Sequence, residues 1–125
     1  MNNERRCFFF MKKRSIYSRS FNNKCNGWTN SRKLNKYFLR LVECYFNDIL
    51  RCRGYVYLKD VYEYLGIPLD AESYDVGWIY DEKNPIGDNF IDFGLSYEFE
   101  YRGHANIILD FNVVEDIGKL FKERA

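Results

Sequence analysis

One stretch of regularly spaced apolar residues constrains the fold more than any other feature of this chain. From Ser31 onward, large apolar side chains recur at steps of three and four residues, which places them along one side of an α-helix. They are Leu34, Phe38, Leu41, Val42, Tyr45, Phe46, Ile49 and Leu50. Asn30 or Ser31 can cap the start of this helix, and Gly54 can adopt the left-handed conformation that ends it. The sequence therefore predicts an amphipathic helix from Ser31 to Arg53.

A second, shorter helix is predicted directly downstream. Residues 55–58 are β-prone, and the apolar residues between Leu58 and Leu65 again have helical spacing. Gly66 can end this helix, and Pro68 cannot continue it. We expect the two helices to form a hairpin.

The second half of the chain has the pattern of β-strands. The expected strands are Val76–Tyr80, Phe90–Tyr101 and Asn106–Val113, and apolar and polar residues alternate strictly through most of the middle one. Such alternation indicates a sheet with one buried and one solvated face. A capping-box pattern at residues 112–115 then predicts a short C-terminal helix. The predicted fold is α+β: residues 31–125 form a single domain, with an N-terminal helical hairpin packed on a three-stranded antiparallel sheet.

Composition favours a folded, soluble protein. Of the 125 residues, 46% are hydrophobic and 19% are aromatic, which is enough to build the core of one domain. No apolar run approaches the roughly 18 residues that a membrane helix requires. The four cysteines form no C-x-x-C pair, and Cys44 and Cys52 lie roughly 12 Å apart along one predicted helix, too far for a disulfide. We therefore expect reduced thiols in a cytoplasmic protein.

The first residues are unusual as protein sequence. Phe8, Phe9 and Phe10 stand between charged clusters with neither helical nor strand periodicity. Read as codons, residues 4–7 can encode a purine-rich bacterial ribosome-binding sequence, followed by a T-rich spacer and an ATG at Met11. The interpretation is that translation starts at Met11 and that residues 1–10 are a start-codon artefact. The alternative is a genuine edge strand or hydrophobic tail.

Charge is distributed unevenly along the chain. Residues 1–33 carry nine Lys or Arg and one Glu, whereas residues 34–125 carry ten Lys or Arg and 17 Asp or Glu. We interpret residues 1–30 as a basic arm with little fixed structure. Such an arm can contact nucleic-acid phosphates, and it can equally be a solvated tail or a clamp on the acidic body. The arm residues that would bind nucleic acid are Lys12, Lys13, Arg14, Arg19 and Lys24.

Few residues carry a chemical signature. His104 lies in a predicted turn without a nucleophile motif, and this single histidine lacks the partners that would complete a zinc site. Asp92 and Asp110 have similar strand contexts, so neighbouring strands would bring two carboxylates to one solvated face. Paired carboxylates serve two-metal nucleases, but these normally need further ligands. Solvated strand aspartates are the favoured interpretation, and no catalytic residue, metal site or cofactor is predicted.

Several ordered blocks of residues carry a family resemblance. The first runs from Gly54 to Gly66 and has the pattern Gly-Tyr-Val-Tyr-Leu-x-Asp-Val-Tyr-x-x-Leu-Gly. The others are Gly77-Trp78-x-Tyr80-Asp81, Gly87-Asp88-x-x-Ile91-Asp92-Phe93-Gly94 and Leu109-Asp110-Phe111-Asn112-Val113. Over about residues 31–121, the chain resembles small uncharacterised proteins encoded by phages, prophages and conjugative elements of Gram-positive bacteria. The resemblance implies a mobile-element origin and a cytoplasmic or virion location, and it supplies no activity or catalytic residue.

The function predicted from these features is a non-enzymatic protein-interaction module of a phage or mobile element. The acidic body disfavours DNA, and the 11 tyrosines and two tryptophans are side chains that are enriched at protein interfaces. The expected partner is a host or phage protein, or a second copy of the chain. No membrane or small-molecule substrate is indicated. The alternatives are a nucleic-acid-binding accessory protein that uses the basic arm, a virion component, and a metal-dependent nuclease.

Overall fold

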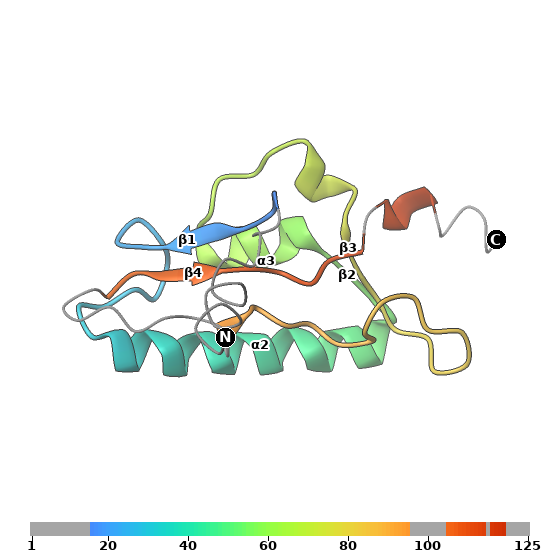
Figure 1. Cartoon of the computed structure of the whole chain (residues 1–125), viewed down its shortest axis with the longest axis horizontal. Helices are drawn as coiled ribbons and strands as arrows, with labels where there is room; N and C mark the ends of the chain where they lie inside the picture. Colours follow the sequence, from blue (N-terminus) through green and yellow to red (C-terminus); the bar gives the residue numbers. More distant parts are fainter. Residues whose placement is uncertain (1–15, 96–104, 115, 120–125) are drawn as a thin grey trace, which may run out of the picture.

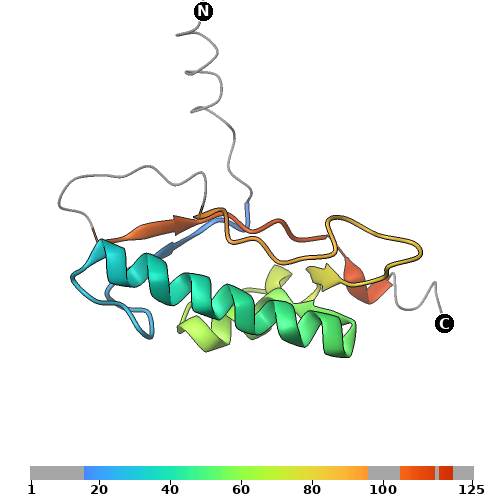
Figure 2. The same cartoon turned by 90° about the horizontal axis from the view of Figure 1, so that it is seen from below.

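The computed structural model describes residues 16–95, 105–114 and 116–119. A long helix, α2 (Arg32–Arg53), runs along one side of these residues, and a shorter helix and two pairs of strands pack against it (Figure 1). Seen from below, α2 lies in front, β1 (Arg19–Phe21) and β4 (Ile107–Leu109) run along one edge of it, and helix α3 (Leu58–Leu65) lies behind it (Figure 2). No helix within the described ranges is long and apolar enough to cross a membrane.

Both ends of α2 have the predicted caps. Ser31 is the N-cap residue, and its side-chain oxygen accepts a hydrogen bond from the backbone N–H of Leu34 (3.2 Å). At the other end, Gly54 has φ +93°, and its N–H donates to the carbonyl oxygen of Leu50 (2.7 Å). Side chains disfavour this left-handed conformation, which explains the glycine. The predicted long helix is confirmed.

The buried side of α2 differs in part from the predicted one. The helix buries Asn35, Leu39, Val42, Phe46 and Leu50. Leu34, Leu41 and Tyr45 belong to the predicted apolar stripe, but they are 57%, 53% and 49% exposed. The apolar arc of α2 is therefore wider than the surface that the other described elements cover.

Helix α3 also begins and ends where the sequence predicts. At its start, the side chain of Asp60 accepts a hydrogen bond from the backbone N–H of Tyr57 (3.3 Å). At its end, Gly66 has φ +74° and donates its N–H to the carbonyl oxygen of Glu63 (3.2 Å). A strand, β2 (Tyr55–Tyr57), joins α2 to α3 in the chain. Both helices are present, and their pairing as a simple hairpin stays a prediction.

The strands within the described residues form two antiparallel pairs. β2 pairs with β3 (Gly77–Ile79), and β1 pairs with β4. Gly77 lies so close to β2 that a Cβ atom there would stand 2.1 Å from the carbonyl oxygen of Val56. Residues 90–95 of the expected middle strand belong to neither pair, and residues 96–101 lie outside the described residues. The predicted three-stranded sheet is therefore wrong.

On one edge of residues 91–95, side chains of α2 form the backbone hydrogen bonds that a neighbouring strand would otherwise form. The alternation that suggested a strand is real, since Ile91, Phe93 and Leu95 are all buried. On one edge of this segment, the Asn47 amide of α2 accepts from the N–H of Ile91 (2.7 Å) and donates to its carbonyl oxygen (3.0 Å). The carboxylate of Glu43, one turn earlier, accepts from the N–H of Phe93 (2.8 Å). On the other edge, the N–H of Asp110 donates to the carbonyl oxygen of Phe93 (2.9 Å). These bonds satisfy the backbone without a regular ladder.

The described part of the expected basic arm is folded. Phe21, in β1, is fully buried, and Tyr17 is 7% exposed. The hydroxyl of Tyr62 donates to the carbonyl oxygen of Tyr17 (3.1 Å), which ties this segment to α3. The prediction of little fixed structure is therefore wrong for residues 16–30, because a strand as short as β1 gives almost no alternation to detect. Residues 1–15 lie outside the described residues.

Aromatic rings form the centre of the core. The ring of Phe111 packs against Tyr62, Trp78 and Phe93, with centroid distances of 5.9, 6.3 and 5.3 Å. Residues 117–119 are helical, and Ile117 is buried with its N–H bonded to the carbonyl oxygen of Asp75 (2.9 Å). The predicted short C-terminal helix is therefore present as far as the description extends.

Candidate protein-interaction surface

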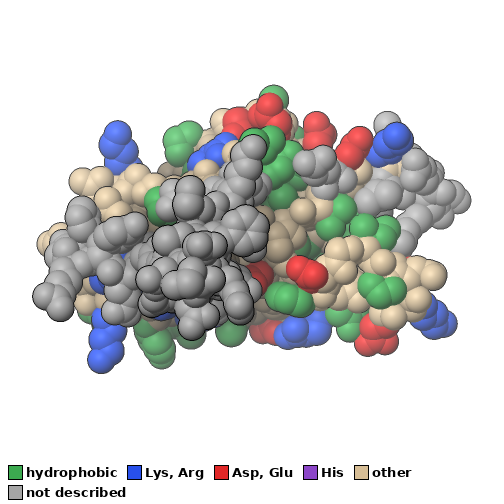
Figure 3. Space-filling view, viewed as in Figure 1, with side chains coloured by type: hydrophobic (Ala, Val, Ile, Leu, Met, Phe, Trp, Pro, Cys, Tyr) green, Lys and Arg blue, Asp and Glu red, His purple; other side chains and the backbone are tan. Residues whose placement is uncertain are grey.

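Five large side chains form an exposed apolar and aromatic surface that we call the tyrosine face. It comprises Leu34, Tyr37, Leu41 and Tyr45 of α2 together with Tyr64 of α3. The four α2 residues are spaced three or four apart, so they stack on one side of the helix. Tyr37 is the most exposed of the five at 64%, and Tyr64 the least at 45%. In Figure 3, hydrophobic side chains project from the lower edge of the molecule, where α2 runs.

Basic side chains border the tyrosine face at the start of α2. A hollow of about 580 Å³ is lined by Arg32, Lys33, Lys36, Tyr37 and Arg40. Two of the cations have partners: Arg32 donates to the carbonyl oxygen of Asn106 (2.8 Å), and Arg40 lies 3.5 Å from Glu43. This end of the surface is therefore positively charged.

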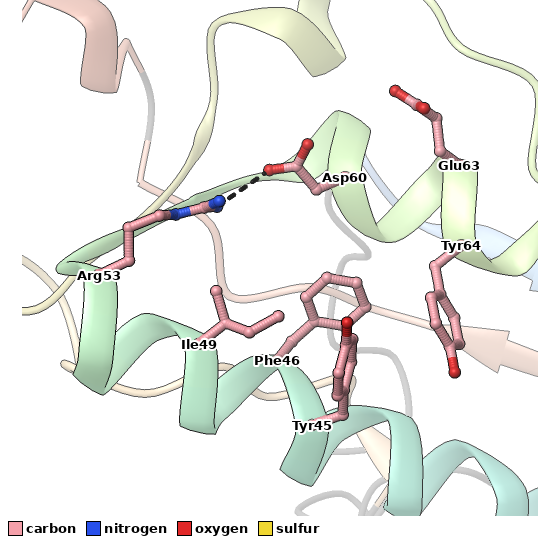
Figure 4. A pocket seen from close by; sticks show the side chains of 7 residues that line it. All are labelled: Tyr45, Phe46, Ile49, Arg53, Asp60, Glu63 and Tyr64. Atoms are coloured by element: carbon pink, nitrogen blue, oxygen red, sulfur yellow. Dashed lines mark hydrogen bonds and ion pairs between the residues drawn. The ribbon is translucent and has the colours of Figure 1, made fainter.

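A pocket of about 370 Å³ lies at the other end, between α2 and α3 (Figure 4). The side chains of Tyr45, Phe46 and Ile49 project into it from α2, and Tyr64 faces them from α3. Arg53 reaches across toward Asp60, and the distance between Arg53 Nη2 and Asp60 Oδ2 is 3.3 Å. Glu63 completes the rim. We call this cavity the α2–α3 pocket.

The two aspartates of the nuclease hypothesis lie on neighbouring segments. The N–H of Asn112 donates to the carbonyl oxygen of Asp92 (3.3 Å), and a Cβ atom at Gly94 would stand 3.1 Å from the Cβ of Asp110. The carboxylate of Asp92 accepts from the N–H of Gly94 (2.7 Å), as in a tight turn. Within the described ranges, no three His, Cys, Asp or Glu side chains are grouped to hold a metal ion. The geometry thus adds no further ligand to this pair.

One further carboxylate in this region is perturbed. The side chain of Glu43 is 14% exposed, and burial raises its pKa above the ordinary value of 4.5. The negative charge of Asp92 raises it further, whereas the hydrogen bond from Phe93 and the charge of Arg40 lower it. Because the Glu43 carboxylate binds the chain's own backbone, its role in the structure is to hold the segment around Phe93.

The candidate nucleic-acid residues are only partly described. Arg19 forms an ion pair with Asp70, and its guanidinium lies over the ring of Tyr62, 5.4 Å from the centroid. These contacts occupy Arg19 inside the domain. Lys24 is exposed, whereas Lys12, Lys13 and Arg14 lie outside the described residues, as does His104. Of the cysteines that the structure describes, Cys25, Cys44 and Cys52 are free thiols.

Comparison with known proteins assigns the chain to a family. The model of DUF6353, a family of unknown function, matches residues 2–120. The chain belongs to this family. No curated protein and no solved structure matches it. The matched range includes residues 2–10, which the start-codon hypothesis places outside the protein, and that hypothesis stays a prediction.

The tyrosine face of this DUF6353 chain was only partly recognisable in the sequence. The pattern places Leu34, Leu41 and Tyr45 in one apolar stripe with residues that are buried, such as Val42 and Phe46. The pattern does not distinguish Tyr37 or Tyr64 from the other tyrosines. The available signal was the width of the apolar arc, because Tyr37 lies one turn from both Leu34 and Leu41. A helix with apolar residues over so wide an arc exposes some of them unless partners surround it.

Proposed function

We propose that the chain is a non-enzymatic protein-interaction module that binds a partner protein through the tyrosine face. One observation carries the proposal: a continuous row of large apolar side chains, each about half exposed, on a well-capped helix. Contiguous apolar patches on a monomer are typical of interaction sites. Tyrosines anchor interfaces with little loss of conformational freedom, so a rigid helix that presents several of them suits tight binding.

The nature of the partner belongs to the same proposal. The resemblance of residues 31–121 to mobile-element proteins supports a phage or mobile-element origin, a cytoplasmic location, and a host or phage protein as the partner. A second copy of the chain is the other protein partner that an exposed apolar face accommodates. Nucleic acid is less favoured than protein, because Arg19 is already paired with Asp70. The nuclease hypothesis stays the rival, and a plasmid nicking assay with Mg²⁺, using Asp110→Asn as the test variant, distinguishes it from ours.

Site-specific photocrosslinking tests the proposal. A benzoylphenylalanine residue replaces either Tyr37, on the tyrosine face, or Tyr74, which is 51% exposed on a different surface. The expected result is a nuclease-resistant adduct with one defined protein from position 37 and none from position 74. Adducts of equal yield from the two positions, or adducts removed by nuclease, would contradict the proposal.

A matched pair of double variants measures the energetic contribution of the face. Tyr37→Ser with Leu41→Ser should weaken partner binding at least roughly tenfold, because interface anchors commonly contribute more than about 1 kcal/mol each. The control, Tyr74→Ser with Leu69→Ser, removes the same residue types from an exposed region elsewhere and should leave binding unchanged. Both pairs should retain stability, since the four residues are exposed. Equal losses of affinity in the two variants would refute the assignment of the surface.

A further inference from the structure

We propose that the α2–α3 pocket binds a cationic side chain, arginine or lysine, of the partner protein. This inference rests on the proposed function and deepens it, because it states the chemistry that the partner presents at one end of the tyrosine face.

The shape and lining of the pocket suit a long side chain with a charged end. The rings of Tyr45 and Tyr64 have centroids 5.4 Å apart, and the ring of Phe46 meets both edge-on, at 5.1 and 5.5 Å. Ile49 adds an aliphatic, half-buried surface beside them. Figure 4 shows these side chains converging on the space between the two helices. Apolar walls can pack against a methylene chain, and aromatic faces attract a cation.

The one cation in the described lining is already occupied. The Nε of Arg53 donates to the carbonyl oxygen of Tyr55 (3.0 Å), and the guanidinium lies over the Tyr55 ring, 4.5 Å from its centroid. Its Nη2 contacts Asp60, which is also 3.3 Å from the Nζ of Lys59. Arg53 is therefore turned toward β2 and the start of α3, and its charge is compensated locally.

The carboxylate of Glu63 supplies the charge that a partner can use. Glu63 is exposed on the rim, and it forms no side-chain hydrogen bond or ion pair with any residue that the structure describes. Asp60 is paired with both Arg53 and Lys59, so Glu63 is the carboxylate of the described lining whose charge stays open to a partner. Glu63 would repel an acidic side chain, and a neutral donor could form a hydrogen bond with it but would lack the attraction between opposite charges. A guanidinium or ammonium group complements both the carboxylate and the aromatic rings.

A small-molecule probe tests the pocket without knowledge of the partner. n-Butylguanidinium, which carries the end of an arginine side chain, is titrated into the full chain and followed by the NMR resonances of the Ile49 methyl groups and the Tyr64 ring. The expected result is a saturable shift with a dissociation constant in the millimolar range, as for other small fragments. Neutral n-butylurea should bind at least roughly threefold more weakly, and pentanoate should cause no saturable shift.

Two glutamine variants separate the pocket from general surface charge. Glu63→Gln should weaken binding of n-butylguanidinium roughly twofold to fivefold, the range for partly exposed ion pairs. Glu72→Gln removes another exposed glutamate, in the short 3-10 helix η1 (Glu72–Tyr74), and should leave binding unchanged. Equal affinity for the guanidinium and the urea, or an unchanged affinity in Glu63→Gln, would overturn the inference.

The outcomes distinguish this inference from the proposed function. Crosslinking from position 37 together with a failed titration would mean that the tyrosine face binds a partner whose cation does not enter the pocket. A successful titration without specific crosslinking from position 37 would support the pocket and contradict the use of the whole face.

Discussion

The side chain of Asn112 connects its own segment to Trp78 and to residues 88–92. Its removal should lower the free energy of unfolding more than the removal of an exposed asparagine side chain would. Its Oδ1 accepts from the indole N–H of Trp78 (2.7 Å) and from the backbone N–H of Asp92 (2.8 Å). Its Nδ2 donates to the carboxylate of Asp88 (2.9 Å) and to the carbonyl oxygen of Phe90 (3.0 Å). All the hydrogen-bonding capacity of the amide is therefore used.

The expected cost of Asn112→Ala follows from the groups that it leaves behind. Asp88 is exposed and can bind water in place of the amide. Trp78 is only 3% exposed, so its indole N–H would lose its partner in the core. The carbonyl oxygen of Phe90 is also bonded at an exposed position, so the two bonds to Trp78 and Asp92, at about 1 kcal/mol each, give an expected loss of about 2 kcal/mol. Since a domain of this size has a free energy of unfolding of about 5–15 kcal/mol, this loss is large.

The chain offers a closely matched control. The Oδ1 of Asn106 also accepts from an indole N–H, that of Trp28 (3.1 Å), but at an exposed position. Asn106→Ala should therefore cost about 0.5 kcal/mol or less, because water can replace the amide. The comparison keeps the residue type and the substitution constant, and it changes both the burial of the indole and the number of further hydrogen bonds that the amide makes.

Urea unfolding followed by far-ultraviolet circular dichroism measures the difference. With a denaturant slope of about 1.5 kcal/mol per M, Asn112→Ala should lower the urea midpoint by about 1.3 M, and Asn106→Ala by about 0.3 M. Asn112→Asp keeps both acceptor bonds but places a second carboxylate beside that of Asp88, so it should also be destabilised relative to the wild type. If Asn112→Ala and Asn106→Ala lower the free energy of unfolding by amounts that agree within about 0.5 kcal/mol, the reasoning is refuted.

Three further predictions follow from other parts of the molecule. Burial raises the pKa of Glu43, so the folded state holds this proton more tightly than the unfolded state. The stability of the wild type should therefore fall relative to that of Glu43→Gln as pH rises above about 4.5 and through the raised pKa. An equal difference in stability between the two proteins at pH 4 and at pH 7, measured by urea unfolding, would contradict this. In the same assay, Gly77→Ala should destabilise the domain by about 2 kcal/mol or more, because the new Cβ atom would clash with the carbonyl oxygen of Val56. Gly118 lies in a helix with open space around it, so Gly118→Ala should stabilise the domain by up to about 1 kcal/mol. Protein expressed from its native upstream DNA should have an intact mass that begins at Met11, and a mass that includes residues 1–10 would show that the start-codon hypothesis is wrong.

The helices could be predicted from sequence because their signals are local. Helical spacing, a serine cap and a terminating glycine all lie within or next to α2, and Gly54 and Gly66 have the positive φ angles that end the two helices. The buried side of α2 was harder to predict. Asn35 is fully buried although it is polar, because its amide bonds to backbone and hydroxyl groups of Thr29 and to the carbonyl oxygen of Ala105. Nothing in the local pattern of apolar residues indicates such a site.

The strand pairing could not be predicted because it depends on distant segments. β1 has three residues, and its partner β4 follows about 90 positions later. The alternation from Ile91 to Leu95 correctly indicated a buried side, but it could not indicate that Asn47 of α2 would take the place of a strand. Alternation reports which side chains are buried, whereas the groups that satisfy the backbone are set by the tertiary fold.

The residue blocks that carry the family resemblance have mainly structural roles in this fold. Gly54 and Gly66 end the helices, Gly77 allows two strands to approach, and Trp78 is bound by Asn112. The α2 residues of the tyrosine face lie before the first block, and Tyr64 occupies one of its unspecified positions. The blocks therefore identify how the chain folds and leave open what it binds. For the partner, the informative residues are the apolar side chains that the fold leaves exposed.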